Sequence, residues 1–454
     1  MEPTGSEATM AQTGQNGAVQ ACQVEPPAIR AVLQSFKRPR TAWVETQHHG
    51  ESTIPVTVIA GGSATTLTAN GSDRFTELQK RADDLFADLS GTATISHEAR
   101  PRLFGGFAFT DTHDPEISET WTGYPGAEFV LPAIQLVIAD ETAWLTAAAV
   151  GPNAELTVQG RLKAWRDRLA ALPELAAGTR PGVQMLTANP ERDRWRAQVE
   201  AATERITNGD LRKVVLAQSV TASLANQAQV TDILYRLGQE YPDCYRFLFE
   251  PETGGAFFGA TPERLVKRTG TQVETEALAG SIGRGETQEV DDRLAQELLD
   301  SEKNAHEHQL VVDAVREQLS SLTTDVHCGE RSIRRLANVQ HIHTPITATL
   351  THEEHILSLV EALHPTPAVG GLPPAEALAT IREAEAFERG WYAAPVGWFD
   401  AEGDGEFAVA IRSGIATDRK VTLFAGAGIV ADSDPDREYE ELQLKYRPVL
   451  NELE

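Results

Sequence analysis

Near the C-terminus runs the stretch Asp434-Pro-Asp-Arg-Glu-Tyr-Glu-Glu-Leu-Gln-Leu-Lys445, which has the features of a helix start. Ser433 or Asp434 can act as the N-cap, and Pro435 falls in the first turn, where a missing peptide N–H costs nothing. Immediately upstream, the apolar run at 421–430 is typical of a strand that breaks into a glycine turn. The sequence therefore predicts a strand, a glycine turn and a helix in direct succession.

Three charged side chains share one face of this predicted helix. Glu438, Glu441 and Lys445 are spaced i, i+3 and i+7, which places them on the same side. Two carboxylates and an ammonium beside a glycine turn can hold a small carboxylated molecule together with a hard metal ion. The alternative is a solvent-exposed helix whose side chains form i, i+4 ion pairs.

The 454 residues suffice to bury a large core, in two or three domains or in one large domain. No run of about 18 apolar residues occurs, and the polar N-terminus lacks a signal-peptide pattern, so we expect no membrane span. The three cysteines, Cys22, Cys244 and Cys328, stand at wide, unrelated spacings that suggest neither a disulfide framework nor a zinc site. The expected location is the reducing cytoplasm.

The chain is strongly acidic, with 66 Asp and Glu against 40 Lys and Arg and a net charge of −26. Such a surface repels nucleic acid and anionic membranes, so neither is an expected partner. Only eight of the basic residues are Lys, and few Lys with many Asp and Glu is typical of proteins from a high-salt cytoplasm. Each individual lysine is therefore a stronger candidate for a specific role.

The pattern of segments predicts three parts. Residues 1–25 are polar and predict a disordered tail. Residues 26–190 mix strands and helices in an N-terminal α+β region, and the Pro/Gly/Ala-rich segment at 173–190 predicts a connector. In residues 191–454 the helix and strand patterns are clearer. There, Thr351 and Glu354 predict a helix start with a capping box. Helices interleaved with largely antiparallel strands predict an α+β fold of two packed sheets with outer helices and a central cleft.

Lys213 lies inside the apolar stretch Leu211–Ala217, which predicts a buried strand. Strand alternation places its side chain on the same face as Val215. A desolvated lysine can serve as a general base. The alternative is a lysine whose stem lies along apolar surface with its ammonium in water.

Two further carboxylates stand at element boundaries. Glu263 follows a proline turn that leaves a strand, where it can act as an acid or pair with its neighbour Arg264. Glu307 precedes the apolar face of a predicted helix by one turn. It is either a metal ligand that faces a cleft or the i, i+4 partner of Lys303.

Arg412 falls in a predicted strand at 407–415, on the same face as Ala408 and Ala410. Small neighbours beside a guanidinium leave room for a carboxylate to bind through two hydrogen bonds. An ion pair with a facing strand is the alternative.

The glycines at 426 and 428 belong to a G-x-G-x-x-A pattern that follows a strand, as in dinucleotide-binding proteins. Only 23 residues follow Ala431, too few for the rest of a βαβ unit and its ribose-binding acid. The peptide N–H groups of such a turn, at Gly426 and Gly428, can still bind a carboxylate.

Together these segments closely resemble the chorismate-utilising enzymes, and the isochorismate synthases among them. The resemblance covers about Glu191 to Leu450, whereas the first third matches only through its strand pattern and Phe-Gly-Gly-Phe-Ala-Phe (104–109). Nine motifs carry it in colinear order: Lys-Val-Val-Leu-Ala (213–217), Phe-Gly-Ala-Thr-Pro-Glu-Arg-Leu (258–265), Thr-Glu-Ala-Leu-Ala-Gly-Ser (275–281), Ser-Glu-Lys-Asn-x-x-Glu-His (301–308), Val-Gln-His (339–341), His-Pro-Thr-Pro-Ala-Val-Gly-Gly (364–371), Arg-Gly-Trp-Tyr-Ala-Ala-Pro-Val-Gly (389–397), Ile-Arg-Ser (411–413) and Ala-Gly-Ala-Gly-Ile-Val-Ala-Asp-Ser (425–433).

The resemblance implies a reaction and its participants. Residues 191–454 would form the catalytic domain, which converts chorismate to isochorismate for menaquinone or siderophore biosynthesis. Members of the family are often monomers, but the sequence does not fix the oligomeric state. Lys213 resembles the base that activates water for attack at C2 of chorismate, and Glu263 resembles the acid that protonates the departing C4 hydroxyl. Glu307 and Glu441, with Glu438 close by, resemble the carboxylates that bind Mg²⁺.

The same resemblance implies the substrate-binding positions. Those that would hold the enolpyruvyl carboxylate are Tyr392, Arg412 and the amides near Gly426 and Gly428. Lys445 matches a lysine on the carboxylate side, and the further pocket positions are His341, Gly280, Ser281 and Ala368.

A few positions indicate the subclass. Relatives that install an amino group lack the lysine base, so Lys213 favours water as the nucleophile. Salicylate synthases keep the lysine but typically carry Thr and Leu where this chain has Ala368 and Ile411, which favours a reaction that stops at isochorismate. The alternatives are a salicylate synthase, an amino-transferring relative and an inactive chorismate-binding homologue, against which the intact set of candidate residues argues.

Overall fold

The computed structural model describes residues 17–45, 56–92 and 95–454. Ten helices occur in this part of the chain: α1 Ile29–Ser35, α2 Arg74–Ala87, α3 Ala154–Leu169, α4 Arg192–Thr207, α5 Val230–Glu240, α6 Gln288–Asp300, α7 Glu302–Leu319, α8 Ile356–Leu363, α9 Pro374–Ala384 and α10 Pro435–Leu450. The strands are β1 Gly17–Val24, β2 Arg40–Val44, β3 Thr57–Ala69, β4 Leu89–Ser90, β5 Arg102–Phe107, β6 Ala127–Ala139, β7 Thr142–Val150, β8 Val183–Asn189, β9 Lys213–Leu224, β10 Tyr245–Glu250, β11 Ala256–Thr261, β12 Arg264–Thr269, β13 Gln272–Gly283, β14 Thr323–Cys328, β15 Ser332–Arg335, β16 Val339–Leu350, β17 Gly371–Leu372, β18 Pro395–Asp400, β19 Gly405–Val409, β20 Ser413–Thr417 and β21 Lys420–Ile429.

The strands form two packed layers that remain connected by hydrogen bonds. One continuous series of pairings runs through β16, β13, β12, β19, β18, β5, β6, β3, β2, β10, β11, β20, β21 and β9. Strands β14 and β15 also pair with β16, and β8 and β17 also pair with β9. Among the described pairings only β1 with β4 is parallel. The predicted α+β fold of mainly antiparallel sheets is thus confirmed.

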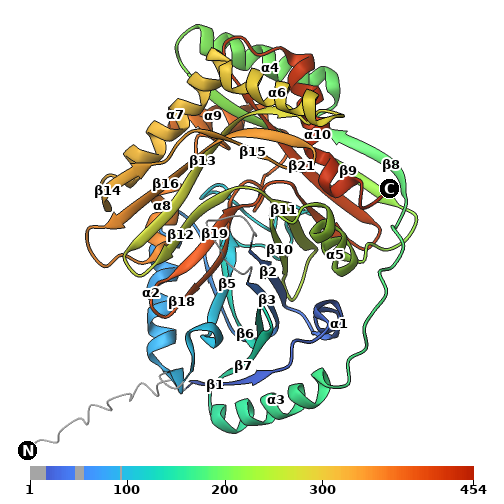
Figure 1. Cartoon of the computed structure of the whole chain (residues 1–454), viewed down its shortest axis with the longest axis vertical. Helices are drawn as coiled ribbons and strands as arrows, with labels where there is room; N and C mark the ends of the chain where they lie inside the picture. The colour runs from blue at the N-terminus through green and yellow to red at the C-terminus, as the bar shows by residue number, and fades with distance from the viewer. Residues whose placement is uncertain (1–16, 46–55, 93–94) are drawn as a thin grey trace, which may run out of the picture.

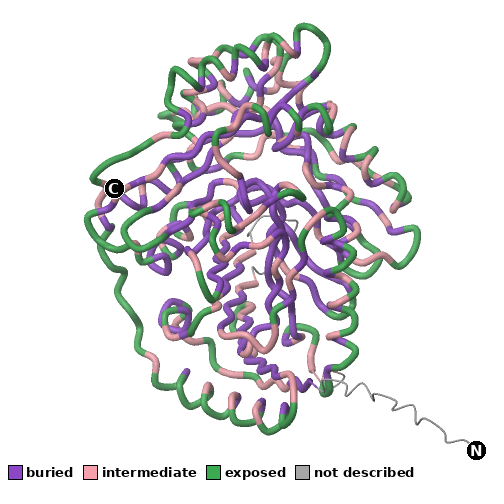
Figure 2. The backbone as a smooth tube through the Cα atoms, turned by 180° about the vertical axis from the view of Figure 1, so that it is seen from behind, coloured by how far each residue is buried: buried purple, intermediate pink, exposed green. Residues whose placement is uncertain are grey.

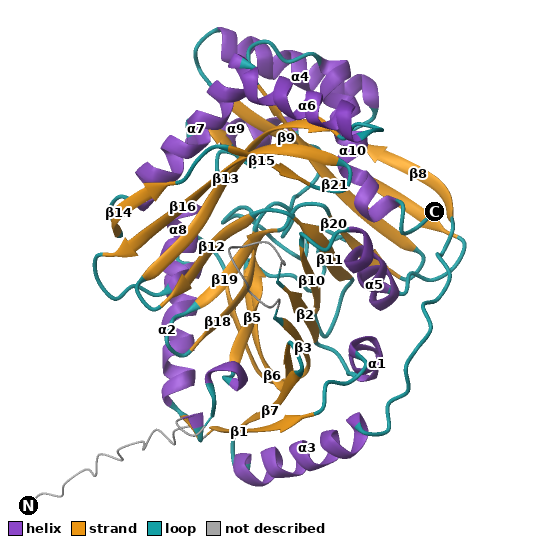
Figure 3. Cartoon of the chain, in the orientation of Figure 1, coloured by secondary structure: helices purple, strands orange, loops and turns teal. Residues whose placement is uncertain are grey.

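Helices cover the outside of the two layers (Figure 1; Figure 3). Helices α4, α6, α7, α9 and α10 lie over the upper layer, and α3 lies at the opposite end of the molecule. Buried backbone is concentrated in the strands, and exposed residues lie mostly on the outer helices and loops (Figure 2). Among the described residues no helix combines the length and apolar character needed to cross a membrane.

Strands from both sides of residue 190 pair directly. Strand β2 pairs with β10, and β5 pairs with β18, each in antiparallel register. The N-terminal region therefore contributes strands to the same hydrogen-bonded network as the C-terminal part. A division of the chain near residue 190 into separate domains stays a prediction.

The helix predicted from Asp434 begins as expected. The Asp434 carboxylate accepts hydrogen bonds from the N–H groups of Asp436 (3.1 Å) and Arg437 (3.0 Å), and Pro435 occupies the first turn. The Ser433 hydroxyl instead accepts from the N–H of Val430, at 3.1 Å. Asp434 is therefore the N-cap, and Ser433 closes the loop before it.

Three predictions of local structure were wrong. Residues 17–24 of the expected tail form β1, which pairs with β7 along its whole length, and residues 1–16 lie outside the described part. The expected connector contains β8, an exposed strand paired with β9 that lacks the buried alternation a sequence would reveal. Helix α8 begins at Ile356 rather than 351, because the N–H of Thr351 donates to the carbonyl of Leu322 and His355 is the N-cap.

Replacing Asp434 by Ala should lower the free energy of unfolding by about 1 kcal/mol, because two N–H groups at the start of α10 lose their acceptor. Urea denaturation followed by circular dichroism measures the change. Asp434→Asn keeps an acceptor oxygen and should behave as the parent chain. Equal destabilisation by both substitutions would show that the cap does not stabilise the helix through these hydrogen bonds.

Candidate functional site

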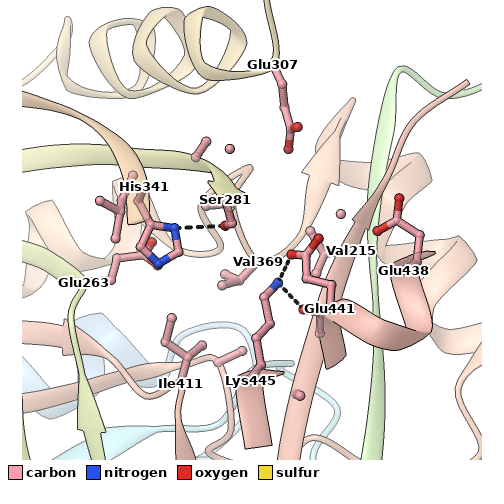
Figure 4. A pocket seen from close by; sticks show the side chains of 18 of the residues that line it. Val215, Glu263, Ser281, Glu307, His341, Val369, Ile411, Glu438, Glu441 and Lys445 are labelled. Atoms are coloured by element: carbon pink, nitrogen blue, oxygen red, sulfur yellow. Dashed lines mark hydrogen bonds and ion pairs between the residues drawn. The ribbon is translucent and has the colours of Figure 1, made fainter. Parts of the chain in front are cut away.

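One cavity of about 370 Å³ is lined by all the candidate catalytic, substrate-binding and metal-binding residues, although they come from distant segments (Figure 4). The cavity is lined by Lys213, Glu263, Gly280, Ser281, Glu307, His341, Ala368, Tyr392, Arg412, Gly426, Gly428, Glu438, Glu441 and Lys445. Their individual roles stay predictions, but their proximity in the fold is a finding.

Lys213 is buried at the start of β9, and its ammonium pairs with Glu307. Its Nζ donates to Oε1 of Glu307 at 2.7 Å. Burial opposes ionisation of Glu307, but the charge and hydrogen bond of Lys213 lower the pKa of its carboxyl overall. Lys303, the other partner considered for Glu307, instead pairs with Asp432 at 3.4 Å.

Glu263 is a buried carboxyl between β11 and β12. Burial and the nearby negative charge of Glu276 raise its pKa to about 8, against the opposing charges of cations in the cavity. Arg264 does not neutralise it, because the Arg264 guanidinium pairs with Glu274 (2.9 Å) and Glu406 (3.2 Å). At neutral pH Glu263 is therefore mainly protonated and able to donate a proton.

Helix α10 presents Glu438, Glu441 and Lys445 to the cavity (Figure 4), together with Arg437. Lys445 pairs with Glu441 at 2.5 Å and donates to the carbonyl of Gly426 at 2.7 Å. Burial and the charge of Glu441 raise the pKa of Glu438 to about 7. Glu438, Glu441 and Lys445 thus share one helix face, as predicted from the sequence. Glu441 and Lys445 also form an i, i+4 ion pair, as the alternative interpretation of this helix expected.

The carboxylates of Glu307, Glu438 and Glu441 fit a divalent cation by donor type. They are hard oxygen ligands on two helices that line the same cavity, as Mg²⁺ prefers. In the present arrangement Glu307 and Glu441 pair with lysines, and within residues 17–45, 56–92 and 95–454 no group of three acidic, His or Cys side chains is preformed for a metal. Binding a cation there requires these ion pairs to rearrange.

Gly426 and Gly428 lie in strand β21, so the prediction of a glycine turn was wrong. A Cβ on Gly428 would lie 3.0 Å from Cε of Lys213, and one on Gly426 would lie 3.1 Å from the hydroxyl of Tyr392. The glycines therefore leave space for two cavity side chains.

The peptide groups of these glycines point away from β9. Their partners across the ladder, Val215 and Ala217, donate their N–H groups to Gly370 (2.9 Å) and Glu385 (2.8 Å), on the other side of β9. Val215 with Gly428, and Ala217 with Gly426, are therefore non-hydrogen-bonded pairs of the antiparallel ladder. In such a pair the N–H and C=O groups of both residues point away from the partner strand. Strand β20 pairs with β21 only as far as Phe424, so the amides of both glycines remain available for a ligand, as the family resemblance implies.

Arg412 lies between β19 and β20 rather than inside one long strand, which corrects the prediction. Its φ of 51° is in the left-handed region, which interrupts the alternation expected with Ala408 and Ala410. The guanidinium is buried in the cavity wall, and no ion-pair partner for it occurs among the described residues. An unpaired buried guanidinium is suited to bind a carboxylate.

His341, Ser281 and Gly280 form one corner of the cavity. The Ser281 hydroxyl and Nδ1 of His341 are 2.9 Å apart, and Nε2 of His341 is buried without a partner among the described residues. Burial and nearby cations lower the pKa of His341, which keeps the imidazole neutral. Gly280, with a φ of 78°, forms the bulge in β13 that directs Ser281 toward His341.

Arg389 was not assigned a role from sequence, yet it anchors the wall beside Lys213. Its guanidinium pairs with Glu385 and donates to the carbonyls of Val369 (2.8 Å) and Val215 (2.7 Å). The i, i+4 spacing from Glu385 was the available signal. Further cavity residues without an assigned role are Val215, Lys303, Asn304, Val369, Phe424 and Arg437.

The family model described as chorismate binding enzyme matches residues 9–454, which extends the match through the N-terminal third. The chain is 39% identical over 366 residues to isochorismate synthase MenF of Bacillus subtilis, covering 79% of this chain and 76% of that protein. It is 39% identical over 402 residues to the salicylate biosynthesis isochorismate synthase of Pseudomonas aeruginosa, covering 85% and 80%.

Solved structures agree on the fold. MenF, the menaquinone-specific isochorismate synthase from Escherichia coli, superposes with a TM-score of 0.79 at 24% identity, covering 98% of this chain and 97% of that one. A putative 2,3-dihydroxybenzoate-specific isochorismate synthase, DhbC from Bacillus anthracis, gives 0.73 at 25% identity, covering 93% and 98%.

The raised pKa of Glu263 predicts an effect on stability. Between a pKa of about 4.5 in the unfolded chain and about 8 in the folded chain, only the folded state holds this proton. The contribution of this group to the free energy of unfolding is therefore lost as the pH rises from about 4.5 to about 8. Glu263→Gln removes the dependence, so denaturation should show the variant gaining stability relative to the parent between pH 5 and pH 9. A constant difference across this range would contradict the raised pKa.

Proposed function

Because this chain belongs to the chorismate binding enzymes, and among them to the isochorismate synthases, we propose that it adds water at C2 of chorismate with loss of the C4 hydroxyl. The observation that carries this mechanism is the buried Glu263 carboxyl in the same cavity as Lys213. A pKa of about 8 means that Glu263 holds a proton at neutral pH for the departing hydroxyl. Lys213 would accept the proton of the attacking water.

Positive charge in the cavity supports a substrate with two carboxylates. Arg412 is buried without a described ion-pair partner, and Lys445 reaches the cavity from α10. We assign Arg412, Tyr392 and the free amides of Gly426 and Gly428 to the enolpyruvyl carboxylate. In a protein with a net charge of −26, this local excess of donors is what allows a dianion to bind.

Mg²⁺ is the proposed cofactor, held by Glu307 and Glu441 with Glu438 close by. When bound, it supplies positive charge next to the ring carboxylate of the substrate. The remaining groups of the chain then perform distinct tasks: Lys213 and Glu263 move protons, and Arg412 and Lys445 orient the carboxylates.

Two cavity residues support isochorismate as the final product. Ala368 and Ile411 both line the cavity, at the positions where the family resemblance distinguishes salicylate synthases. The relatives' names refer to both menaquinone-specific and salicylate biosynthesis enzymes. We propose that isochorismate from this enzyme enters one of these routes.

The direct test is to incubate the purified protein with chorismate and Mg²⁺, at high and at low salt. Isochorismate trapped by an added isochorismate lyase is the expected product. Salicylate formed without that lyase would assign the chain to the salicylate synthases instead. Absence of turnover under every condition, with chorismate still bound, would identify an inactive homologue and overturn the proposal.

Lys213→Ala should reduce turnover by about 10³-fold, since a general base typically contributes 10²–10⁴-fold, while chorismate still binds. Steady-state kinetics and calorimetric titration with chorismate measure the two effects separately. Lys420→Ala is the matched control, because Lys420 is an exposed lysine at the far end of β21. Near-normal turnover of Lys213→Ala would refute its assignment as the base.

Gly428→Ala should lower kcat by about 10–100-fold, because the added methyl group displaces the Lys213 side chain that lies 3.0 Å from it. Gly283→Ala is the control, since a Cβ there meets no atom within 4 Å. Both variants are compared by kcat and by thermal denaturation. If Gly428→Ala lost activity only in proportion to folded protein, the close approach to Lys213 would not matter for turnover.

A further inference from the structure

We propose that Glu276 is a positioning residue for the reaction: an ionised carboxylate behind Glu263 that fixes its backbone and keeps its carboxyl protonated. The inference rests on the proposed function, in which Glu263 is the acid. Glu276 lies in β13 and does not line the cavity described above. It was not assigned a role from the sequence.

Both oxygens of the Glu276 carboxylate are occupied by donors. Oε1 accepts the N–H of Arg264 at 2.9 Å, Nη1 of Arg334 lies 3.0 Å from both oxygens, and Nε2 of His343 lies 2.9 Å from Oε2. Burial opposes ionisation, but Arg334 and His343 together hold the pKa of Glu276 well below its usual range. Glu276 is thus a fixed negative charge at neutral pH.

The contact with the N–H of Arg264 ties this charge to the acid. That N–H belongs to the peptide unit joining Glu263 to Arg264, so Glu276 holds the backbone directly beside the acid. The Arg264 side chain turns elsewhere, with Nε donating to the hydroxyl of Tyr245 at 2.8 Å. A like charge at this place disfavours the ionised form of Glu263.

Cations from three other elements act on Glu263 in the opposite sense. They are Lys213 on β9, Arg412 between β19 and β20, and Lys445 on α10, and all three favour its ionised form. These are the groups assigned to the base and to the substrate carboxylates. Without burial and the charge of Glu276, the cations that bind the substrate would remove the proton that the acid must donate.

The decisive experiment is the pH profile of kcat/KM for Glu276→Gln, which removes the charge but keeps an acceptor oxygen. The basic limb should move down by about one pH unit, giving a several-fold loss near pH 8 and little change near pH 6. A shift of the basic limb, with the rate near pH 6 unchanged, is not expected from structural damage.

Glu274→Gln is the matched control, because Glu274 is a half-exposed carboxylate two residues away on β13 that also contacts Arg264. It should leave the limb in place. A uniform loss of rate at all pH values in Glu276→Gln, with the limb unmoved, would mean that Glu276 only supports the fold and would overturn the inference.

Infrared titration of the protonated carboxyl in the free protein gives a readout that needs no turnover, with Glu263→Gln used to identify the band. The Glu263 band should titrate at lower pH in Glu276→Gln than in the parent. If the parent turned over no chorismate, the proposed function would fall, and this titration would still decide whether Glu276 controls Glu263. An unchanged titration in a parent that does turn over chorismate would overturn the inference alone.

Discussion

The antiparallel pairing of β9 with β21 determines where the groups of the cavity lie, because Lys213 begins one strand and Gly428 lies near the end of the other. Its register sets Gly428 opposite Val215 and Gly426 opposite Ala217. A slip by one residue would turn every side chain to the other face and bring Ala427 or Ile429 under the lysine. The space that Lys213 occupies and the direction of the Gly426 and Gly428 amides therefore depend on this one register.

Two lysines of the cavity each pair with a cavity carboxylate. Lys213 pairs with Glu307, and Lys445 pairs with Glu441, whereas Arg412 has no such partner among the described residues. Buried ion pairs offset the cost of desolvating both charges only when their geometry is good. The two carboxylates that the family resemblance assigns to Mg²⁺ are the same ones that neutralise the lysines. Carboxylate position and lysine charge are consequently coupled in this site.

The sequence was sufficient for the fold class and for the membership of the cavity, because nine colinear motifs constrain both at once. It was insufficient where a side chain's direction depends on the backbone. Arg412 required knowledge of its left-handed conformation, and Gly426 and Gly428 are strand residues although glycine pairs usually indicate turns. Strand β8 escaped detection because, at an exposed edge, it lacks an apolar alternation. Tertiary pairing decided each of these cases.

The proposed acid, Glu263, shares one small cavity with three cations, and its surroundings favour its protonated form. Glu263 is buried beside the fixed negative charge of Glu276 on β13, whereas Lys213, the proposed base, pairs with the carboxylate of Glu307 on α7. Three cations, Lys213, Arg412 and Lys445, oppose the protonated state of Glu263, so the charges proposed to bind the substrate work against the proposed proton donor. A buried carboxylate behind the acid resolves this conflict without adding a negative charge to the cavity surface that a dianionic substrate would meet.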